Sequence, residues 1–299
     1  MSDYIKQHAI NLDYHTGESW IILNEIEQSI KKKIEAVGTP LKDWNIKINR
    51  GILTGLNEAF IISKKKRDEL VEADPKSVEI IRPILRGRDI KRNKIDFQDK
   101  YLIALFPSKN YDIEKFPAIK DWLLNGDWVT AKTKTNPPTP IGSGKLRLEQ
   151  TGETHTFKGV KFKSRKKTTN KWFEIQDSIQ YWDDFNKPKI IYPETTQGAY
   201  FVLDNKKFML DKTCFMITNC ENLTYLQCTL SSYLFEFAYK RIYASIELGI
   251  KGYQYNKYAL TKLPVKKYSK NVALNNDDIF KLYSLTNEEI NYITSSLGI

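Results

Sequence analysis

The sequence predicts an α+β fold, a mixed α/β arrangement in which short strands form one or more sheets and helices lie around them. Two kinds of pattern predict it. Several segments repeat apolar residues every three or four positions, as helices do, and others are apolar or alternating over only four to six residues, as short strands are. The chain has 299 residues, 41% of them hydrophobic and 12% aromatic, which is enough for a substantial core in one large domain or two smaller ones.

The first predicted helix covers residues 19–37 and ends at Gly38. Its apolar stripe is formed by Leu23, Ile26, Ile30, Ile34 and Val37. Residues 44–62 are predicted to form a β-hairpin or a strand–loop–strand, because Trp44, Ile46 and Ile48 alternate and an apolar run returns after a glycine-containing turn. The glycines of that block, together with Asn57 and Phe60, are expected to shape a tight loop.

The middle of the chain is predicted to alternate short helices with loops. Residues 64–90 begin as a helix and continue as a loop that Pro75 and Pro83 interrupt. A short strand is expected in residues 99–107. A helix follows in residues 111–126, with Pro117 close to its first turn. Residues 130–144 hold three prolines and two glycines, so a loop or an internal boundary is expected there.

The last part of the chain is predicted to contain three strands and two helices. The strands are expected in residues 187–194, 199–204 and 214–218, and a long helix in residues 222–243. A loop rich in tyrosine and lysine, residues 249–265, comes next. The final helix is predicted by a capping box of Thr286 and Glu289 and by a glycine at its end.

The composition favours a polyanionic partner. The net charge is +11, and a surplus of this size speaks for nucleic acid rather than for an acidic protein. The three cysteines have no spacing that is typical of zinc or of a disulfide framework, which indicates a reducing cytosol. We see neither a signal peptide nor an apolar run long enough to span a bilayer, so we expect a cytoplasmic protein without membrane contact.

The strongest local feature is the stretch 158–171, "KGVKFKSRKKTTNK", in which seven of fourteen residues are basic and none is acidic. Lys158, Lys161 and Lys163 are predicted to lie on a strand edge or ribbon, with a mobile loop as the alternative. Arg165 is expected to make a bidentate contact with guanine. The residues predicted to contact DNA are Arg147, Lys163, Arg165, Lys166, Lys167, Asn170, Lys171, Arg86, Arg88, Gln254 and Lys257.

Two of these groups have a structural alternative. Arg86 and Arg88 would equally serve in an ion pair with Asp89. The polar and aromatic loop 253–257 would equally serve in packing.

Motifs for catalysis are weak in this sequence, and we predict no catalytic, cofactor-binding or metal-binding residue. "IGSGK" (141–145) follows a proline-rich loop instead of a strand and lacks a third glycine. "NPPTP" (136–140) has Thr139 where an amino-methyltransferase motif has its aromatic ring. Asp183 and Asp184 match a metal-dependent nuclease only loosely.

Several ordered blocks of the chain resemble one family, the TaqI-like C-terminal specificity domain of type IIG restriction–modification enzymes and their relatives. The blocks are "KIEAVGTPLKDWNIKINRGILTGLNEAFII", "IIRPILRGRDIKR", "RLEQTGETHTFKGVKFKSRKKTTNKWFEIQDSIQYWDDFNKPKIIYPETTQ" and "LTKLPV". The resemblance implies a fold like the target recognition domains of type I specificity subunits. It also implies double-stranded DNA as partner, beside a methyltransferase domain that uses S-adenosylmethionine and, in many such enzymes, a nuclease domain that uses Mg²⁺.

The resemblance leads to a division of the chain and to a function. We expect a flexible segment 1–18, a target recognition domain 19–265 with an internal loop boundary near 130–145, and a linker and helix 266–299. The domain would recognise a DNA sequence without catalysis of its own, either as part of a type IIG enzyme or as a separate specificity subunit. The alternatives are a subunit that docks on a methyltransferase through helices 19–37 and 276–297 with little DNA contact, and an independent Mg²⁺-dependent nuclease.

Overall fold

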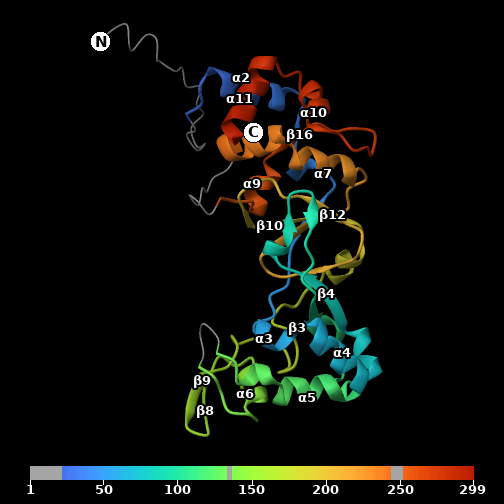
Figure 1. Ribbon diagram of the computed structural model, residues 1–299, viewed down its shortest axis with the longest axis vertical. Coiled ribbons are helices and arrows are strands. Elements are labelled where there is room, and N and C mark those ends of the chain that lie inside the picture. The colour runs from blue at the N-terminus through green and yellow to red at the C-terminus, as the bar shows by residue number, and fades with distance from the viewer. Residues whose placement is uncertain (1–21, 133–136, 244–251) are drawn as a thin grey trace, which may run out of the picture.

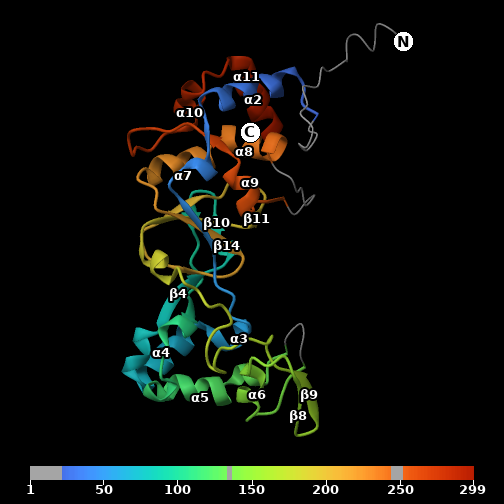
Figure 2. The same cartoon turned by 180° about the vertical axis from the view of Figure 1, so that it is seen from behind.

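The computed structural model describes residues 22–132, 137–243 and 252–299. They form an elongated molecule with two hydrophobic cores that follow one another along its long axis (Figures 1 and 2). One part of the molecule surrounds one of these cores and contains both ends of the described chain; we call it the helical lobe. The part around the other core, which carries α3 to α6, is called the second lobe. The mixture of helices and several small open sheets confirms the predicted α+β class.

A central four-stranded sheet joins the two lobes. Its strand order is β12 (Val202–Asp204), β10 (Lys189–Pro193), β14 (Cys214–Thr218) and β2 (Lys47–Arg50), and every neighbour pairs antiparallel. The three predicted strands of the rear part are therefore confirmed and lie in one sheet.

Both faces of this sheet are buried, each in a different core. Along β14, Cys214 and Met216 belong to the core of the second lobe, whereas Phe215 and Ile217 belong to the core of the helical lobe. Successive side chains of a strand point to opposite faces, so one continuously apolar strand supplies both cores. This explains why the run "CFMIT" is apolar throughout instead of alternating.

The helical lobe gathers helices from both ends of the chain around one core, to which one face of the central sheet also contributes. They are α2 (Glu25–Val37), α7 (Leu223–Ser231), α8 (Tyr233–Ala238), α9 (Lys257–Thr261), α10 (Asn276–Leu282) and α11 (Asn287–Leu297). The predicted capping box at Thr286 and the left-handed glycine at the end of α11 are confirmed. In α2, Ile30 and Ile34 are buried and Val37 is 41% exposed, so the predicted stripe covers most of the buried face.

The second lobe is built on a second four-stranded sheet. Its order is β13 (Met209–Leu210), β4 (Ile81–Leu85), β7 (Lys100–Ile103) and β3 (Ile61–Ser63), with β13 parallel to β4. The helices beside it are α3 (Asn57–Phe60), α4 (Lys64–Ala73), α5 (Pro117–Asn125) and α6 (Gly144–Leu148). Pro117 stands in the first turn of α5, as predicted.

Four two-stranded pairs and several single turns of helix complete the structure. The pairs are β1 (Thr39–Pro40) with β16 (Pro264–Val265), β5 (Ile90–Lys91) with β6 (Lys94–Ile95), β8 (Thr154–Phe157) with β9 (Val160–Lys163), and β11 (Thr195–Thr196) with β15 (Tyr253–Gln254). The short 3₁₀ or π turns are Leu41–Asp43, Pro75–Glu79, Gly87–Asp89, Pro107–Lys109, Ile113–Lys115, Asp127–Val129, Trp182–Asn186 and Tyr239–Tyr243.

Three predictions about elements need correction. Of the two alternatives for residues 44–62, the hairpin is wrong, because β2 pairs with β14 in the central sheet and β3 pairs with β7 in the second sheet. Two strands with a connection remain, and the connection includes the short helix α3. Pro83 lies inside β4 and not in a loop. The predicted helix 222–243 is divided at Ser232, whose extended backbone ends α7 and whose hydroxyl caps α8.

No helix in the described ranges is both long enough and apolar enough to cross a membrane.

Candidate nucleic-acid interface

The basic stretch begins as an ordered two-stranded ribbon. β8 and β9 pair antiparallel around the turn Lys158–Gly159, and both turn residues have positive φ angles, of 45° and 78°. A two-residue turn of this kind matches the natural twist of paired strands. The ribbon projects sideways from the second lobe in both views (Figures 1 and 2). This confirms the predicted ribbon, rather than the alternative of a mobile loop.

The two faces of the ribbon differ in polarity. Lys161 and Lys163 are exposed, and the register places Thr156 and Thr154 opposite them. Phe162 is buried on the other face, where its ring lies 6.0 Å from that of His155. The strand alternation therefore fixes the ribbon to the lobe by its apolar face and presents lysines and threonines to solvent.

Arg165 corrects one prediction, because it lies in the interior and not on a DNA-facing surface. Its side chain is 5% exposed and makes four hydrogen bonds to three main-chain carbonyls. Nε and Nη2 donate to Leu148 O at 2.9 and 2.7 Å, Nη1 to Thr54 O at 3.0 Å, and Nη2 also to Trp172 O at 2.7 Å. Burial lowers the pKa of Arg165 to about 9, so the guanidinium stays charged at neutral pH.

Arg147 requires the same correction. It is 2% exposed, and its Nη1 donates to Val129 O at 2.6 Å and to Thr139 Oγ1 at 3.2 Å. Burial lowers the pKa of this guanidinium too. Its position beside the ring of Trp128, 5.2 Å from the centroid, makes it part of the packing between α6 and the preceding loop.

The rest of the predicted stretch divides into held and exposed residues. Asn170 is held, because its Nδ2 donates to Ile175 O and Gln176 O at 3.2 and 3.0 Å. Lys171 is exposed and bonds Asn110 Oδ1 at 2.7 Å. Lys166 and Lys167 are exposed, and neither forms an ion pair within the described ranges. Within the stretch 158–171, the exposed charge therefore lies on the ribbon, on these two lysines and on Lys171.

A pocket of about 670 Å³ lies where the second sheet meets the central sheet; we call it the waist pocket. Arg86 and Arg88, which follow β4, line it together with Lys91, Glu194 and Asp211. A pocket of this volume is within the range of ligand sites in proteins. Its lining includes Pro193 of the central sheet, and Arg86 and Asp211, which directly follow β4 and β13 of the second sheet.

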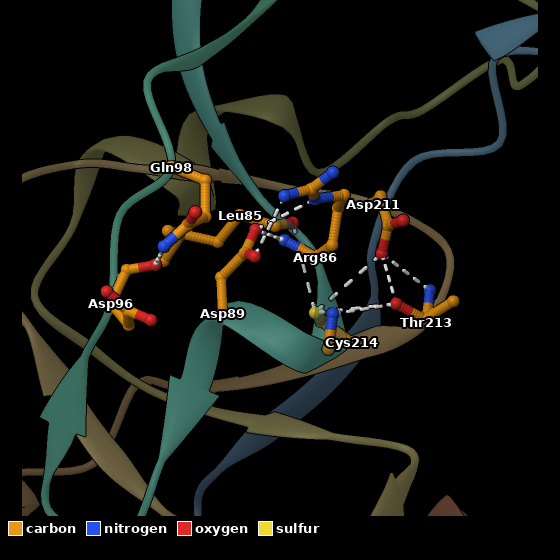
Figure 3. Close-up of polar contacts among 9 residues, drawn as sticks. Leu85, Arg86, Asp89, Asp96, Gln98, Asp211, Thr213 and Cys214 are labelled. Atoms are coloured by element: carbon orange, nitrogen blue, oxygen red, sulfur yellow. Dashed lines mark hydrogen bonds and ion pairs between the residues drawn. The ribbon is translucent and has the colours of Figure 1, made fainter.

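Arg86 forms the predicted ion pair with Asp89 and still lines the waist pocket. Nε and Nη2 of Arg86 donate to the two carboxylate oxygens, both at 3.0 Å, and Asp89 also accepts from the Arg86 main-chain N–H. Asp89 is 1% exposed, whereas the Arg86 side chain is 18% exposed. Figure 3 shows the Asp89 carboxylate against one edge of the guanidinium.

A second set of bonds holds the same turn against the central sheet. Gly87 N–H donates to Thr213 Oγ1 at 2.8 Å, and Thr213 Oγ1 donates to Asp211 (Figure 3). Cys214 lies next to this pair, and burial raises the pKa of its thiol well above the ordinary value. The thiol is therefore protonated and inert at neutral pH.

The remaining predicted residues lie near the waist pocket or farther along the chain. Arg88 is exposed and lines the pocket. Gln254 sits beside it, where its Nε2 donates to Glu194 Oε1 at 3.2 Å. Lys257 is exposed at the start of α9.

The sequence analysis missed several residues of the waist pocket. They are Asn57, Lys91, Thr195, Thr196 and Gln197. For Thr195, Thr196 and Gln197 the sequence did offer a signal, because polar residues are clustered directly after the apolar run "KIIYP".

The ribbon and the waist pocket are connected through the interior. Arg165, at the exit of the ribbon, binds Thr54 O, and Thr54 Oγ1 donates to Asn57 Oδ1 at 2.6 Å. Asn57 in turn lines the pocket. A chain of hydrogen bonds therefore runs from the exit of the ribbon to the lining of the pocket.

Two residues of the weak catalytic motifs have structural roles. Asp184 is buried, and it accepts from Lys187 Nζ at 2.6 Å and from Asn49 Nδ2 at 3.2 Å. A Cβ on Gly144 would lie 2.2 Å from Leu124 O, so the glycine allows α5 and α6 to approach each other. The start of "NPPTP" lies outside the described residues. Within the described ranges no group of three or more His, Cys, Asp or Glu is placed to hold a metal ion.

Comparison with known proteins gives one family, and the similar solved structures include two restriction–modification enzymes. The sequence profile of the TaqI-like C-terminal specificity domain matches residues 82–265. A comparison with curated proteins gives no match. The type IIG restriction endonuclease BpuSI is similar at 15% identity and a TM-score of 0.49, covering 90% of this chain and 28% of that one. The type IIL restriction–modification enzyme MmeI, solved in complex with DNA, is similar at 13% identity and a TM-score of 0.39, covering 79% and 25%. The chain thus spans about a quarter of the length of either enzyme.

Proposed function

Because the chain belongs to the family of TaqI-like C-terminal specificity domains, we propose that it binds duplex DNA and recognises a target sequence for a restriction–modification enzyme. Methyl transfer from S-adenosylmethionine, and any Mg²⁺-dependent cleavage, are then tasks of another domain or chain. The family match supports the general role in target recognition. Binding in the cytoplasm and the identity of the catalytic partner are part of the same proposal.

The observation that carries the proposal is the basic ribbon. Its lysines, with Lys166 and Lys167 beside it, form a projecting surface of one sign of charge. Lysines set against phosphates release condensed counterions, which drives binding that depends on salt. A two-stranded ribbon also fits the width of the major groove. We infer that this surface holds the DNA backbone and orients the rest of the domain on it.

The first test is a fluorescence titration of the chain with duplex DNA at several salt concentrations. Replacing Lys161, Lys166 and Lys167 with Ala should weaken binding to every sequence. If all three meet phosphates, the slope of log K against log salt should fall by roughly 3, since each phosphate contact adds about 0.9.

A matched control removes the same charge outside the second lobe, with Lys32 and Lys42 of the helical lobe and Lys47 of β2 replaced by Ala. The control should leave the slope unchanged. Equal losses in the two triple variants would show that net charge alone drives binding, and salt-independent binding of the wild type would refute the proposal. In the latter case the alternative of a subunit that docks on a methyltransferase through α2, α10 and α11 becomes the better explanation.

A further inference from the structure

We propose that the waist pocket reads the edge of a guanine, with Arg86 as the bidentate donor and Asp89 as the residue that positions it. This inference rests on the proposed binding of duplex DNA and adds to it a site that selects the base. It separates two tasks: the ribbon binds phosphates of any sequence, and the pocket distinguishes one base from another.

The geometry of Arg86 leaves one edge of its guanidinium available. A guanidinium has five N–H donors in a planar fork. Asp89 accepts from Nε and Nη2, which lie on one edge. Among the described residues no side chain or carbonyl accepts from Nη1, and Figure 3 shows the other terminal nitrogen of Arg86 directed away from Asp89. The edge formed by Nη1 and Nη2 is the one that offers two parallel donors to a ligand.

The guanidinium of Arg86 is held in place by its contacts. Asp89 is fixed in a 3₁₀ turn and is almost completely buried. The turn is fastened to the central sheet through Gly87 and Thr213. A side chain that is held in this way loses little conformational entropy when it binds, which favours discrimination between closely similar ligands.

The charges around the pocket favour a base edge over a phosphate. Two carboxylates, Glu194 and Asp211, lie in the lining with the basic residues, and they would repel a phosphate. Both are already bonded, Glu194 to Arg50 at 3.0 Å and Asp211 to Thr213. A neutral base edge avoids this repulsion and still gains the charged donor.

Guanine is the base that fits two parallel donors. In the major groove it presents two adjacent acceptors, O6 and N7, whereas adenine pairs one acceptor with one donor and cytosine presents a donor. An arginine fork therefore binds guanine through two hydrogen bonds and the other bases through one at most. Arg88 and Lys91, which are exposed at the rim of the pocket, supply further positive charge towards the flanking DNA.

The experiment selects duplexes from a random library with the 299-residue chain and identifies the enriched sequence. Each guanine of that sequence is then replaced by 7-deazaguanine, which lacks N7 and leaves every phosphate unchanged. We expect one guanine position at which this replacement weakens binding by the wild type. Arg86→Lys, which keeps the charge but loses the fork, should lower the preference for guanine at that position by roughly 5- to 150-fold. This variant should lose no further affinity when the guanine at that position is replaced by 7-deazaguanine.

The controls separate the pocket from fold and from general binding. Arg241→Lys breaks a comparable arginine–carboxylate pair, with Glu27 in the helical lobe, and should leave the selected sequence unchanged. Asp89→Asn keeps Arg86 but removes the carboxylate that holds its guanidinium. This variant should weaken the preference for guanine at the same position. The 7-deazaguanine scan on the wild type needs no variant, so it decides the question even where Arg86→Lys does not fold.

Three results would overturn the inference. The first is a wild type that binds duplex DNA without enriching any sequence. The second is wild-type binding that no 7-deazaguanine weakens. The third is that Arg86→Lys loses the same affinity for every sequence, and that this loss becomes smaller when one phosphate of the duplex is replaced by a methylphosphonate. That result would identify a phosphate contact of Arg86. In each of these cases the wild type still binds duplex DNA, and its affinity still depends on salt. If the proposed function itself is wrong, neither the binding nor its salt dependence is observed.

Discussion

Arg165 stands in the middle of the most basic stretch of the chain and yet contacts only protein. Its guanidinium joins three segments, through carbonyls of Leu148, Thr54 and Trp172. The charge count of the stretch predicted a DNA contact, but it does not tell which side chain turns inward. What turns Arg165 inward is the set of main-chain carbonyls that the fold gathers around it.

The first prediction concerns this residue. Arg165→Ala should lower the free energy of unfolding by about 3 kcal/mol or more, because three buried carbonyls lose a charged donor. Thermal unfolding followed by circular dichroism measures it. Lys166→Ala, one residue along and exposed, should leave the melting temperature unchanged, and similar melting temperatures for both variants would contradict the structural role of Arg165.

At the scale of elements, the central sheet decides how the two lobes meet. β2 continues past Gly51 to a bridge between Ile52 and Asp211. Gly51 N–H donates to Cys214 O at 2.8 Å, and a Cβ at this glycine would lie 2.0 Å from Asp211 O. The sequence predicted a structural role for this glycine in a loop, and the structure shows the physical reason, which is close contact between two backbones.

The second prediction follows from that contact. Gly51→Ala should destabilise the protein by at least ~2 kcal/mol, because a backbone atom must move to relieve the overlap. Chemical denaturation gives the free energy. Gly159→Ala is the comparison, since it places Ala at a positive φ with no atom within 4 Å of the new Cβ. It should cost about 1 kcal/mol from backbone strain alone, and an equal loss in both variants would argue against the overlap.

Elements that depend on local pattern were predicted well, and those that depend on partners were not. The final helix and the strands 189–193 and 214–218 match the prediction, because capping and apolar runs are local signals. Of the two alternatives for 44–62, the hairpin failed because alternation shows that a strand has one buried face, but not which strand it pairs with. The prediction of one continuous helix over 222–243 failed because Ser232 gives only a weak local signal of the break.

At the scale of the whole molecule, polar contacts cross from one lobe to the other. Arg92 follows β5 in the second lobe, and its guanidinium forms an ion pair with Glu236 of α8 in the helical lobe. Lys240 bonds the same carboxylate at 2.7 Å. The expected division into 1–18, 19–265 and 266–299 stays a prediction, although Ile279 and Ile293 of the last segment share a core with α2.

The third prediction is a pH dependence of stability. Burial by itself raises the pKa of Glu236, but the hydrogen bonds from Lys240 and Arg92 outweigh it and hold that pKa below its ordinary value. The folded state therefore binds the proton less readily than the unfolded state. This stabilisation is complete above the ordinary pKa of a glutamate and is lost as the pH falls through the lowered one.

Glu236→Gln should accordingly be less stable than the wild type by about 2 kcal/mol at pH 7, and the difference should shrink as the pH is lowered from about 5 to 3. Urea denaturation over this range measures both effects. Glu114→Gln alters an exposed carboxylate and should follow the wild type. A difference that stays constant with pH would show that the ionised form of Glu236 does not contribute.

Sequence alone was enough to predict the class of fold, the main helices and strands, the surplus of positive charge and the family. These follow from periodicity, composition and ordered motifs, all of which are local or additive along the chain. Only the tertiary structure decided which basic residues face solvent. It turned Arg165 and Arg147 inward, left Lys166 and Lys167 outside, and placed Arg86 between Asp89 and a pocket. The physical reason is that burial and pairing depend on segments distant in sequence, which no local pattern specifies.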